Sequence, residues 1–219
     1  MTAPAVTSRP SLGELTRWRT VDLVTAAMLG VAFGVAYWGW SAAYTVVSPA
    51  FTAVPALGGL LGGPWLLAGV VGGLVVRRPG AALLAELVAA NVEYLLGNQW
   101  GVATLVSGLL QGLGVEIVLA IFLFRRFGPG VAALSAALAA TLETAYEYFT
   151  YDYATTFGAG GTVLYLVTFM LSGVLLAGLL GWLIVRALTR SGALAAFPAG
   201  REQARARDAE LQRNTTSAR

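Results

Sequence analysis

Five carboxylic acids lie within apolar segments of this sequence, where ionisable side chains are costly. They are Glu86, Glu93, Glu116, Glu143 and Glu147. No arginine lies deep in the same segments, and the sequence contains neither lysine nor histidine. A buried acid without a basic partner must be protonated, hydrated or matched by a charge from outside the chain. The pattern therefore predicts a cavity in which some of these acids bind a cationic ligand.

The spacing of the acids indicates which of them act together. Glu86 and Glu93 are seven residues apart, which places them on one face of a helix. A second stripe with helical spacing combines acids, rings and a hydroxyl group, and it comprises Glu143, Tyr146, Glu147, Thr150 and Tyr151. Two acids at i and i+4 destabilise a helix unless something compensates their charge. The Glu143 and Glu147 pair is therefore the strongest candidate for a functional role.

Aromatic and polar residues gather at the ends of two other segments: Trp38, Trp40, Tyr44, Asn98, Gln99 and Trp100. Aromatic faces attract organic cations, with about 0.5–2 kcal/mol for each contact. Rings and carboxylates together predict a small, flat, positively charged heteroaromatic ligand. The predicted binding residues are Glu93, Glu143, Glu147, Tyr146, Trp38, Trp100, Asn98 and Tyr151.

Several of these residues also have a purely structural interpretation. Trp38 and Trp100 are typical of residues that anchor a helix at the membrane interface. Glu86 and Glu116 are compatible with deep acids that neighbouring helices satisfy with hydrogen bonds. Gln111 is expected to bridge helices rather than to contact a ligand. Another set is equally compatible with a solvated outer loop: Tyr151, Asp152 and Tyr153.

The composition predicts that membrane-spanning helices position these residues. The chain has 219 residues, 57% hydrophobic and only 11% charged, whereas about 25% charge is typical of soluble domains. A span needs about 20 apolar residues, and six segments approach this length: 21–46, 52–76, 81–96, 102–124, 131–149 and 162–185. We therefore expect an all-α, polytopic membrane protein with six transmembrane helices. Pro55, Pro64 and four glycines predict that the second helix is kinked or broken.

The arginines predict how the chain is oriented in a cell membrane. They precede the first segment and follow the second, fourth and sixth, whereas the other junctions contain none. By the positive-inside rule both termini are cytoplasmic. The expected organisation is a cytoplasmic tail over residues 1–18, a six-helix substrate-binding domain over 19–190, and a disordered basic tail over 191–219.

The residue types that are missing exclude several classes of chemistry. With no cysteine and no histidine, disulfides, thiolate catalysis and the commonest metal ligands are excluded. We expect no cofactor, no metal site and no enzymatic activity. The basic balance of 14 arginines against 11 acids fits contact with anionic lipid rather than with nucleic acid.

Small residues in the first segment predict close helix contacts. Ala26, Gly30 and Gly34 form one ridge, and Ala32 and Ala36 form another. Such ridges let helix backbones approach each other. A ridge can serve packing within the chain, or it can dock another membrane subunit. Ala26, Gly30 and Gly34 are the predicted docking residues.

Several of these segments resemble the substrate-binding S components of energy-coupling-factor (ECF) vitamin transporters, and among them the YkoE type that is assigned to thiamine or its hydroxymethylpyrimidine precursor. The resemblance extends over most of residues 20–190 and rests on the six predicted spans and four sequence stretches: AAMLGVAFG, PALGGLLGGPWLLAGVVGGL, ELVAANVEYLLGNQWG and ETAYEYFTYDY. It implies a vitamin pocket near the outer surface, no ATPase in the chain itself, and association with a transmembrane coupling (T) subunit and ABC-type ATPase subunits. Family members usually carry an Ala-xxx-Ala motif in the first span, whereas glycines replace two alanines in the first ridge here.

Four other functions remain open at this point, and one of them, an assembly factor, would not require the acidic and aromatic residues. The chain could serve as an S component for a different small vitamin or a neutral pyrimidine, which competition between cationic and neutral analogues would reveal. It could be a stand-alone secondary transporter that uses glutamate protonation, although no inverted repeat is evident. An intramembrane enzyme would have to rely on carboxylates alone.

Overall fold

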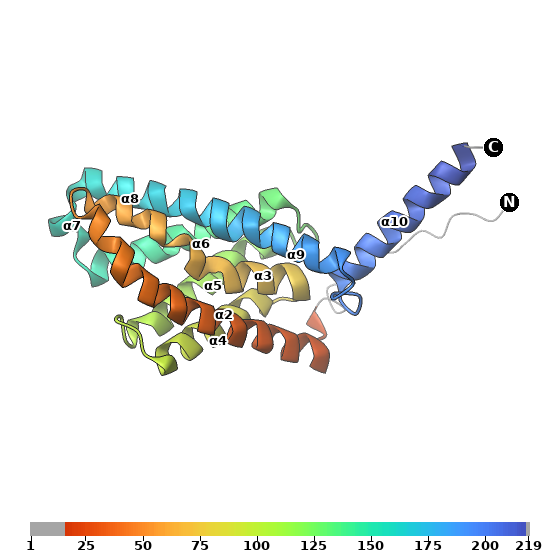
Figure 1. Cartoon of the computed structure of the whole chain (residues 1–219), viewed down its shortest axis with the longest axis horizontal. Helices are drawn as coiled ribbons and strands as arrows, with labels where there is room; N and C mark the ends of the chain where they lie inside the picture. The colour runs from red at the N-terminus through yellow and green to blue at the C-terminus, as the bar shows by residue number, and fades with distance from the viewer. Residues whose placement is uncertain (1–15, 218–219) are drawn as a thin grey trace.

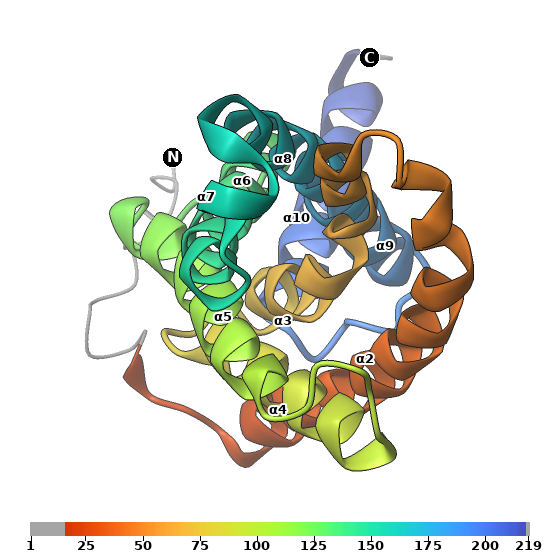
Figure 2. The same ribbon diagram turned by 90° about the vertical axis from the view of Figure 1, so that its left-hand side faces the viewer.

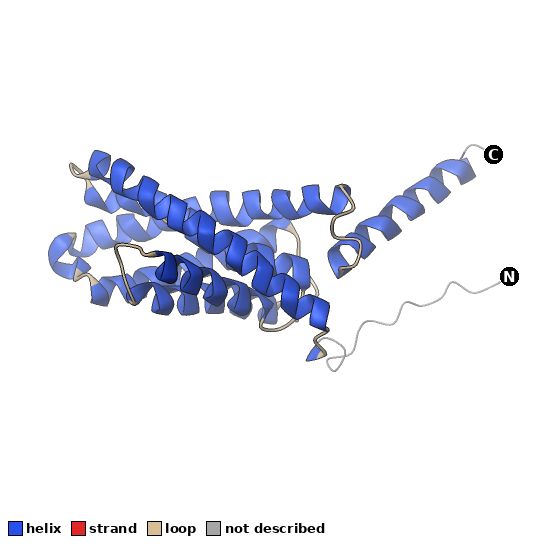
Figure 3. Cartoon of the chain, turned by 60° about the horizontal axis from the view of Figure 1, so that its bottom comes forward, coloured by secondary structure: helices blue, strands red, loops and turns tan. Residues whose placement is uncertain are grey.

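Helices form all the regular secondary structure within residues 16–217, the part of the chain that this computed structural model describes (Figure 3). Side chains are described up to residue 204 and at 207–210. In chain order the elements are α2 (Thr20–Val47), the short 3-10 helices η1 (Ser48–Phe51), η2 (Pro55–Leu61) and η3 (Gly63–Leu66), α3 (Leu67–Val76), α4 (Ala81–Leu96), α5 (Ala103–Ile121), α6 (Pro129–Thr150), α7 (Tyr153–Thr156), α8 (Gly158–Ser172), the π-helix η4 (Gly173–Leu179), α9 (Leu180–Arg190) and α10 (Pro198–Ser217).

Six helical passes run along the long axis of the molecule (Figure 1). Length and hydropathy alone identify three candidate spans, Thr20–Phe51, Ala103–Ile121 and Gly158–Arg190, and a fourth formed by the bent pair η2 and η3–α3. The other two passes are α4, which is shorter, and α6, which carries two acids. Both pack inside the same bundle, α4 against α2 and α5, and α6 against α5 and η4. The all-α, six-pass architecture predicted from the sequence is confirmed.

The second pass is broken, as its prolines and glycines predict. Its two halves meet at an angle of 42°. Hydroxyl groups of α8 hold the broken half. Thr168 Oγ1 donates to the carbonyl oxygen of Ala56 at 3.1 Å, and Ser172 Oγ donates to that of Leu60 at 2.6 Å and accepts from the Gly63 amide at 3.1 Å. Backbone groups that the break frees are thus satisfied by a neighbouring helix.

The first small-residue ridge packs inside the bundle. Ala26, Gly30 and Gly34 are buried, and α2 has its most extensive contacts with α4. A Cβ atom at Gly30 would lie 2.7 Å from the carbonyl oxygen of Ala85, and one at Gly34 equally close to that of Ala89. Glycine is therefore required for this close approach. The ridge offers no exposed surface for a second subunit, which differs from the docking role that we expected for it.

The C-terminal tail also differs from expectation, because α10 replaces the predicted disorder over Pro198–Ser217. Alanine, glutamine and charged residues with high helix propensity fill this segment, and proline occupies its first position. Leu194 and Phe197 are buried just before it, and Glu202 forms an ion pair with Arg77. Local propensity and these contacts together explain the helix. Most of the expected N-terminal tail lies outside the described residues.

Candidate functional site

A cavity of about 440 Å³ opens at the end of the bundle that is farthest from α10. The view onto this end shows the helices arranged around α3 (Figure 2). Residues from α2, the 3-10 helices, α4, α5, α6, α7 and α8 line the cavity. The break in the second pass contributes directly, since Pro55, Gly58, Gly62 and Trp65 are among the lining residues.

Four carboxylic acids face this cavity, two from α4 and two from α6: Glu86, Glu93, Glu143 and Glu147. Three of their oxygen atoms are buried without any hydrogen-bond partner among the described residues, namely Glu86 Oε1, Glu143 Oε2 and Glu147 Oε2. None of the described lining residues is basic. A buried acid oxygen without a partner is costly. These three oxygen atoms therefore receive neither a hydrogen bond nor a positive charge from the described residues, and a ligand could supply either one.

Asp22, near the opposite end of the molecule, shows the contrasting arrangement. Its carboxylate lies 2.5 Å from Arg19 and 3.6 Å from Arg78. This buried acid is neutralised within the chain. The cavity acids have no such partner, which distinguishes a structural acid from a candidate ligand-binding acid.

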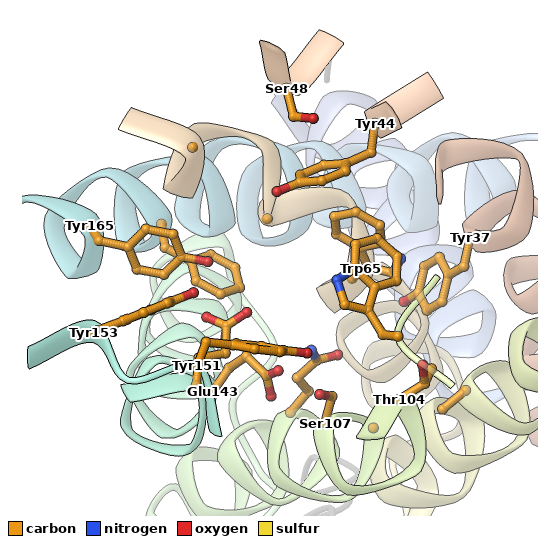
Figure 4. Close-up of a pocket in the computed structure, with 18 of the residues that line it drawn as sticks. Tyr37, Tyr44, Ser48, Trp65, Thr104, Ser107, Glu143, Tyr151, Tyr153 and Tyr165 are labelled. Carbon is orange, nitrogen blue, oxygen red and sulfur yellow. The ribbon is translucent and has the colours of Figure 1, made fainter. Parts of the chain in front are cut away.

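Glu143 and Glu147 are one helical turn apart on α6, and each has polar neighbours on one side only. Ser107 and Gln111 of α5 are polar neighbours of the Glu143 carboxyl group. The hydroxyl groups of Tyr153 and Tyr165 approach Glu147 in the same way. Figure 4 shows Glu143, Tyr153 and Tyr165 converging on the cavity. The α6 pair thus has polar neighbours, and each of its acids keeps one buried oxygen atom without a described hydrogen-bond partner.

Glu93 has a different environment because the protein itself uses it. Its Oε1 atom accepts hydrogen bonds from Ser41 Oγ at 2.5 Å and from the indole nitrogen of Trp65 at 3.1 Å. These contacts join α4 to α2 and to η3. Glu93 lines the cavity, and its hydrogen bonds position Trp65.

Glu86 lies at the inner end of the cavity and connects it to the broken pass. Its Oε2 atom accepts from the Gly69 amide at 2.6 Å and from the Tyr37 hydroxyl group at 3.3 Å, and that hydroxyl group accepts from the Ala68 amide at 2.7 Å. Glu86 thus satisfies the Gly69 amide in the first turn of α3, and the Tyr37 hydroxyl group satisfies the neighbouring Ala68 amide. The fifth acid, Glu116, lies outside the cavity lining and accepts from the Ala82 amide at 2.8 Å.

Aromatic rings cover two walls of the cavity. On one wall the Trp65 ring lies 5.1 Å from that of Trp100 and 5.7 Å from that of Tyr44, edge to face. On the other wall the Tyr153 ring lies 5.0 Å from that of Tyr165. Figure 4 shows Trp65 across the cavity from Tyr153 and Tyr165. A flat ligand between them would contact rings and acids together.

Five of the eight predicted binding residues line the cavity: Glu93, Glu143, Glu147, Trp100 and Tyr151. The other three do not. Trp38 is 45% exposed on the outer face of α2, and Tyr146 lies outside the lining of the described cavity. Asn98 shapes the loop that carries Trp100, since its Oδ1 atom accepts from the Trp100 and Gly101 amides at 3.0 and 2.8 Å.

Several lining residues were not predicted: Tyr37, Trp65, Thr104, Ser107, Gln111, Tyr153 and Tyr165. For Tyr37 a signal was available in the sequence. Residues 26, 30, 34, 37 and 41 repeat every three or four positions and are all buried, so the small-residue ridge leads directly to Tyr37. Trp65 and Tyr165 had no such signal, because the break and the packing of α8 place them.

The arrangement defines an all-helical membrane protein with a cavity whose volume is in the usual range for small-molecule sites. Over residues 21–142 the chain matches the family described as "ABC-type cobalt transport system, permease component". A solved structure described as an S-component of an ECF transporter has a TM-score of 0.84 and 30% sequence identity, and the match covers 90% of this chain and 98% of that one. The chain belongs to this family of transporter S components.

One relative carries a more specific name than the family does. A protein of Bacillus subtilis (strain 168), named as an HMP/thiamine permease protein, YkoE, is 31% identical over 185 residues, which cover 84% of this chain and 92% of that protein. The resemblance found in the sequence is thus confirmed at the level of the family. Within the described residues, no group of three or more acids could hold a metal ion.

Proposed function

We propose that this chain is the substrate-capture subunit of an ATP-driven ECF vitamin importer and binds thiamine or its hydroxymethylpyrimidine precursor in the acidic cavity. The main support is the set of three buried carboxyl oxygens without partners in a cavity lined by rings. The name of the Bacillus subtilis relative points to the same ligands. A cavity of about 440 Å³ is within the usual range for small-molecule sites.

The chemistry of thiamine suits both walls of the cavity. Its aminopyrimidine ring offers N–H donors to the free oxygens of Glu143 and Glu147. Its thiazolium ring carries a fixed positive charge, which suits the faces of Trp65 and Trp100. The ligand would thereby supply the donors and the charge that these oxygen atoms lack. Tyr151 closes the same space from the end of α6.

We further propose that the cavity opens to the outside of the cell membrane and that both termini are cytoplasmic. Arg77 and Arg78 follow α3, and Arg125 and Arg126 follow α5, at the ends of these helices that lie away from the cavity. Arg186 and Arg190 lie in the last turns of α9 at the same end of the bundle. This distribution obeys the positive-inside rule. In this orientation the site faces the vitamin before import.

Energy for import would come from other subunits, a transmembrane coupling (T) subunit and ABC-type ATPases. The first ridge is buried, so docking must use another surface. Ala32 and Ala36 form the second small-residue ridge of α2, and both are exposed, as are Met28 and Val35 beside them. A small-residue ridge on a membrane-facing helix allows close approach of a partner helix. We propose this face of α2 for the docking of the coupling subunit.

Fluorescence titration of the detergent-purified chain tests the proposed ligand. Trp65 and Trp100 line the cavity, so thiamine should quench the emission of the protein in a saturable manner. Hydroxymethylpyrimidine should bind through the pyrimidine contacts alone, and biotin should have no effect. Unchanged emission in excess thiamine and hydroxymethylpyrimidine would contradict the proposal, and equal quenching by biotin would show that the cavity is not selective.

A further inference from the structure

A second cavity, of about 420 Å³, lies at the other end of the bundle, where α3 and α9 end and α10 begins. Its lining differs from that of the first cavity because it contains two arginines, Arg77 and Arg186, with one acid, Glu202. Thr189 and Gln203 add further polar groups. The charge balance of this cavity is positive, and its polar groups suit an anionic ligand.

Arg77 is held in place before any ligand binds. It ends α3 in the left-handed conformation, with a φ of 56°, although glycine is the usual residue there. Its Nε atom donates to the carbonyl oxygen of Leu74 at 3.2 Å, and its guanidinium group lies 4.4 Å from the centre of the Phe127 ring. The side chain is only 17% exposed. A fixed, largely buried guanidinium group is a preorganised site for an oxyanion.

Arg186 supplies a second positive charge from the side that faces lipid. It is exposed, lies over the Trp182 ring at 5.1 Å, and has no ion-pair partner among the described residues. Leu179, Leu180 and Leu183 are exposed on the preceding turns of α9. Arg186 follows Leu183 by three residues, which is a rise of about 4.5 Å along a helix. Arg186 therefore lies just beyond the apolar surface. Acyl chains on that surface would bring a lipid headgroup to Arg186.

An acid of the chain occupies part of this site. Glu202 of α10 forms an ion pair with Arg77, and the Glu202 side chain is 70% exposed. Because the Glu202 side of this ion pair is open to solvent, its carboxylate is screened and weakly held, so another anion can take its place on Arg77. We propose that the second cavity binds the phosphate group of an anionic phospholipid between Arg77 and Arg186, in place of Glu202. Binding would loosen the contact between α10 and α3.

The test measures lipid retention by the full chain. Protein delipidated in detergent is mixed with equal amounts of phosphatidylglycerol and phosphatidylcholine of the same acyl chains, and bound lipid is counted by native mass spectrometry. We expect retention of phosphatidylglycerol to exceed that of phosphatidylcholine at least fivefold. Arg186→Gln should lower this preference at least threefold, whereas Glu202→Gln should raise phosphatidylglycerol retention. Arg190→Gln is the matched control, because Arg190 is exposed on the same helix outside the cavity lining.

Three results would overturn the proposal. Equal retention of the two lipids would exclude recognition of charge. An equal loss in the Arg186→Gln and Arg190→Gln variants would show a diffuse effect of surface charge. Millimolar inorganic phosphate that displaces the retained phosphatidylglycerol and stabilises the delipidated protein equally well would assign the cavity to a free anion. Arg186 is exposed, so loss of folding does not confound its variant.

Discussion

Glu93 and Glu147 face the same cavity but have different neighbours, and this difference separates their roles. Glu93 accepts from Ser41 and Trp65, so much of its hydrogen-bonding capacity is used within the chain. Glu147 keeps an oxygen atom without any described partner. The sequence analysis predicted both residues as ligand-binding acids, with Glu93 grouped by spacing with Glu86 and Glu147 with Glu143. It could not reveal this division, because the Glu93 partners come from distant segments.

The two acids of α6 are expected to dominate ligand affinity. Hydrogen bonds to charged groups contribute about 1.5–3 kcal/mol, and about 1.4 kcal/mol corresponds to a factor of ten. Glu143→Gln and Glu147→Gln should therefore each weaken thiamine binding roughly 10- to 100-fold in the fluorescence titration. Glu116→Gln is the matched control, because Glu116 is a membrane-embedded acid outside the cavity lining. That variant should lower the melting temperature and leave the affinity unchanged. Equal losses of affinity in all three variants would contradict the assignment.

A second prediction compares two tryptophans that the sequence analysis named equally as ligand-binding residues. Trp100 lines the cavity, whereas Trp38 faces away from it. Trp100→Phe should lower thiamine affinity several-fold, since an indole ring attracts cations more strongly than a phenyl ring. Trp38→Phe should retain wild-type affinity in isothermal titration calorimetry. A loss in Trp38→Phe alone would place the site elsewhere.

Among the elements, α2 shows which structural features the periodicity of the sequence could predict. The bounds of α2 and α4 agree within a few residues with those of the apolar segments predicted from the sequence. The orientation of α2 about its own axis also follows from the sequence, because small residues and Tyr37 share one face. The prediction of Trp38 ignored this periodicity. Adjacent residues on a helix point about 100° apart, so Trp38 cannot share the inner face with Tyr37.

The break in the second pass was predicted, but its consequences were not. Proline and glycine positions indicate where hydrogen bonds between turns are lost. They do not show which neighbour replaces those bonds, and here Thr168 and Ser172 of α8 do so. Trp65 enters the cavity because η3 turns at this point. Long-range packing of this kind leaves no periodic trace in the sequence.

The Ser172 hydroxyl group is expected to stabilise the broken pass. Ser172→Ala removes the bond to Leu60 and leaves the buried Gly63 amide without its acceptor. A buried group of this kind costs about 1–3 kcal/mol, so the melting temperature in detergent should fall by several degrees. Ser191→Ala is the control, since Ser191 is exposed and bonds only to the carbonyl oxygen of Leu188. Equal melting temperatures for the two variants would contradict the role of Ser172.

At the scale of the whole molecule, the two ends have different chemistry. The end with the first cavity presents acids and rings, and the other end presents arginines. The bundle between them has an internal ridge and an external ridge on α2. The positive-inside rule anticipated the charged end, but no rule of composition anticipated α10 or the cavity beneath it.

Two substitutions on α2 should distinguish an effect on complex formation from an effect on the stability of the isolated chain. Ala36→Leu enlarges the exposed ridge and should leave stability and thiamine affinity unchanged while it weakens copurification with the coupling and ATPase subunits. Gly34→Ala places a Cβ atom 2.7 Å from the carbonyl oxygen of Ala89, so it should lower the melting temperature of the isolated chain. Normal complex formation by Ala36→Leu would exclude this face as the docking surface.

The edge-to-face group around Trp65 has a spectroscopic consequence. The Trp65 ring lies 5.1 Å from that of Trp100 and 6.2 Å from that of Trp40. Indoles at such separations share electronic excitation, so their transitions couple and energy migrates among them before emission. The near-ultraviolet circular dichroism of this chain should therefore contain an exciton couplet, and the polarisation of its emission should be low. A molecule that quenches the fluorescence of one of these indoles would therefore lower the emission of all three.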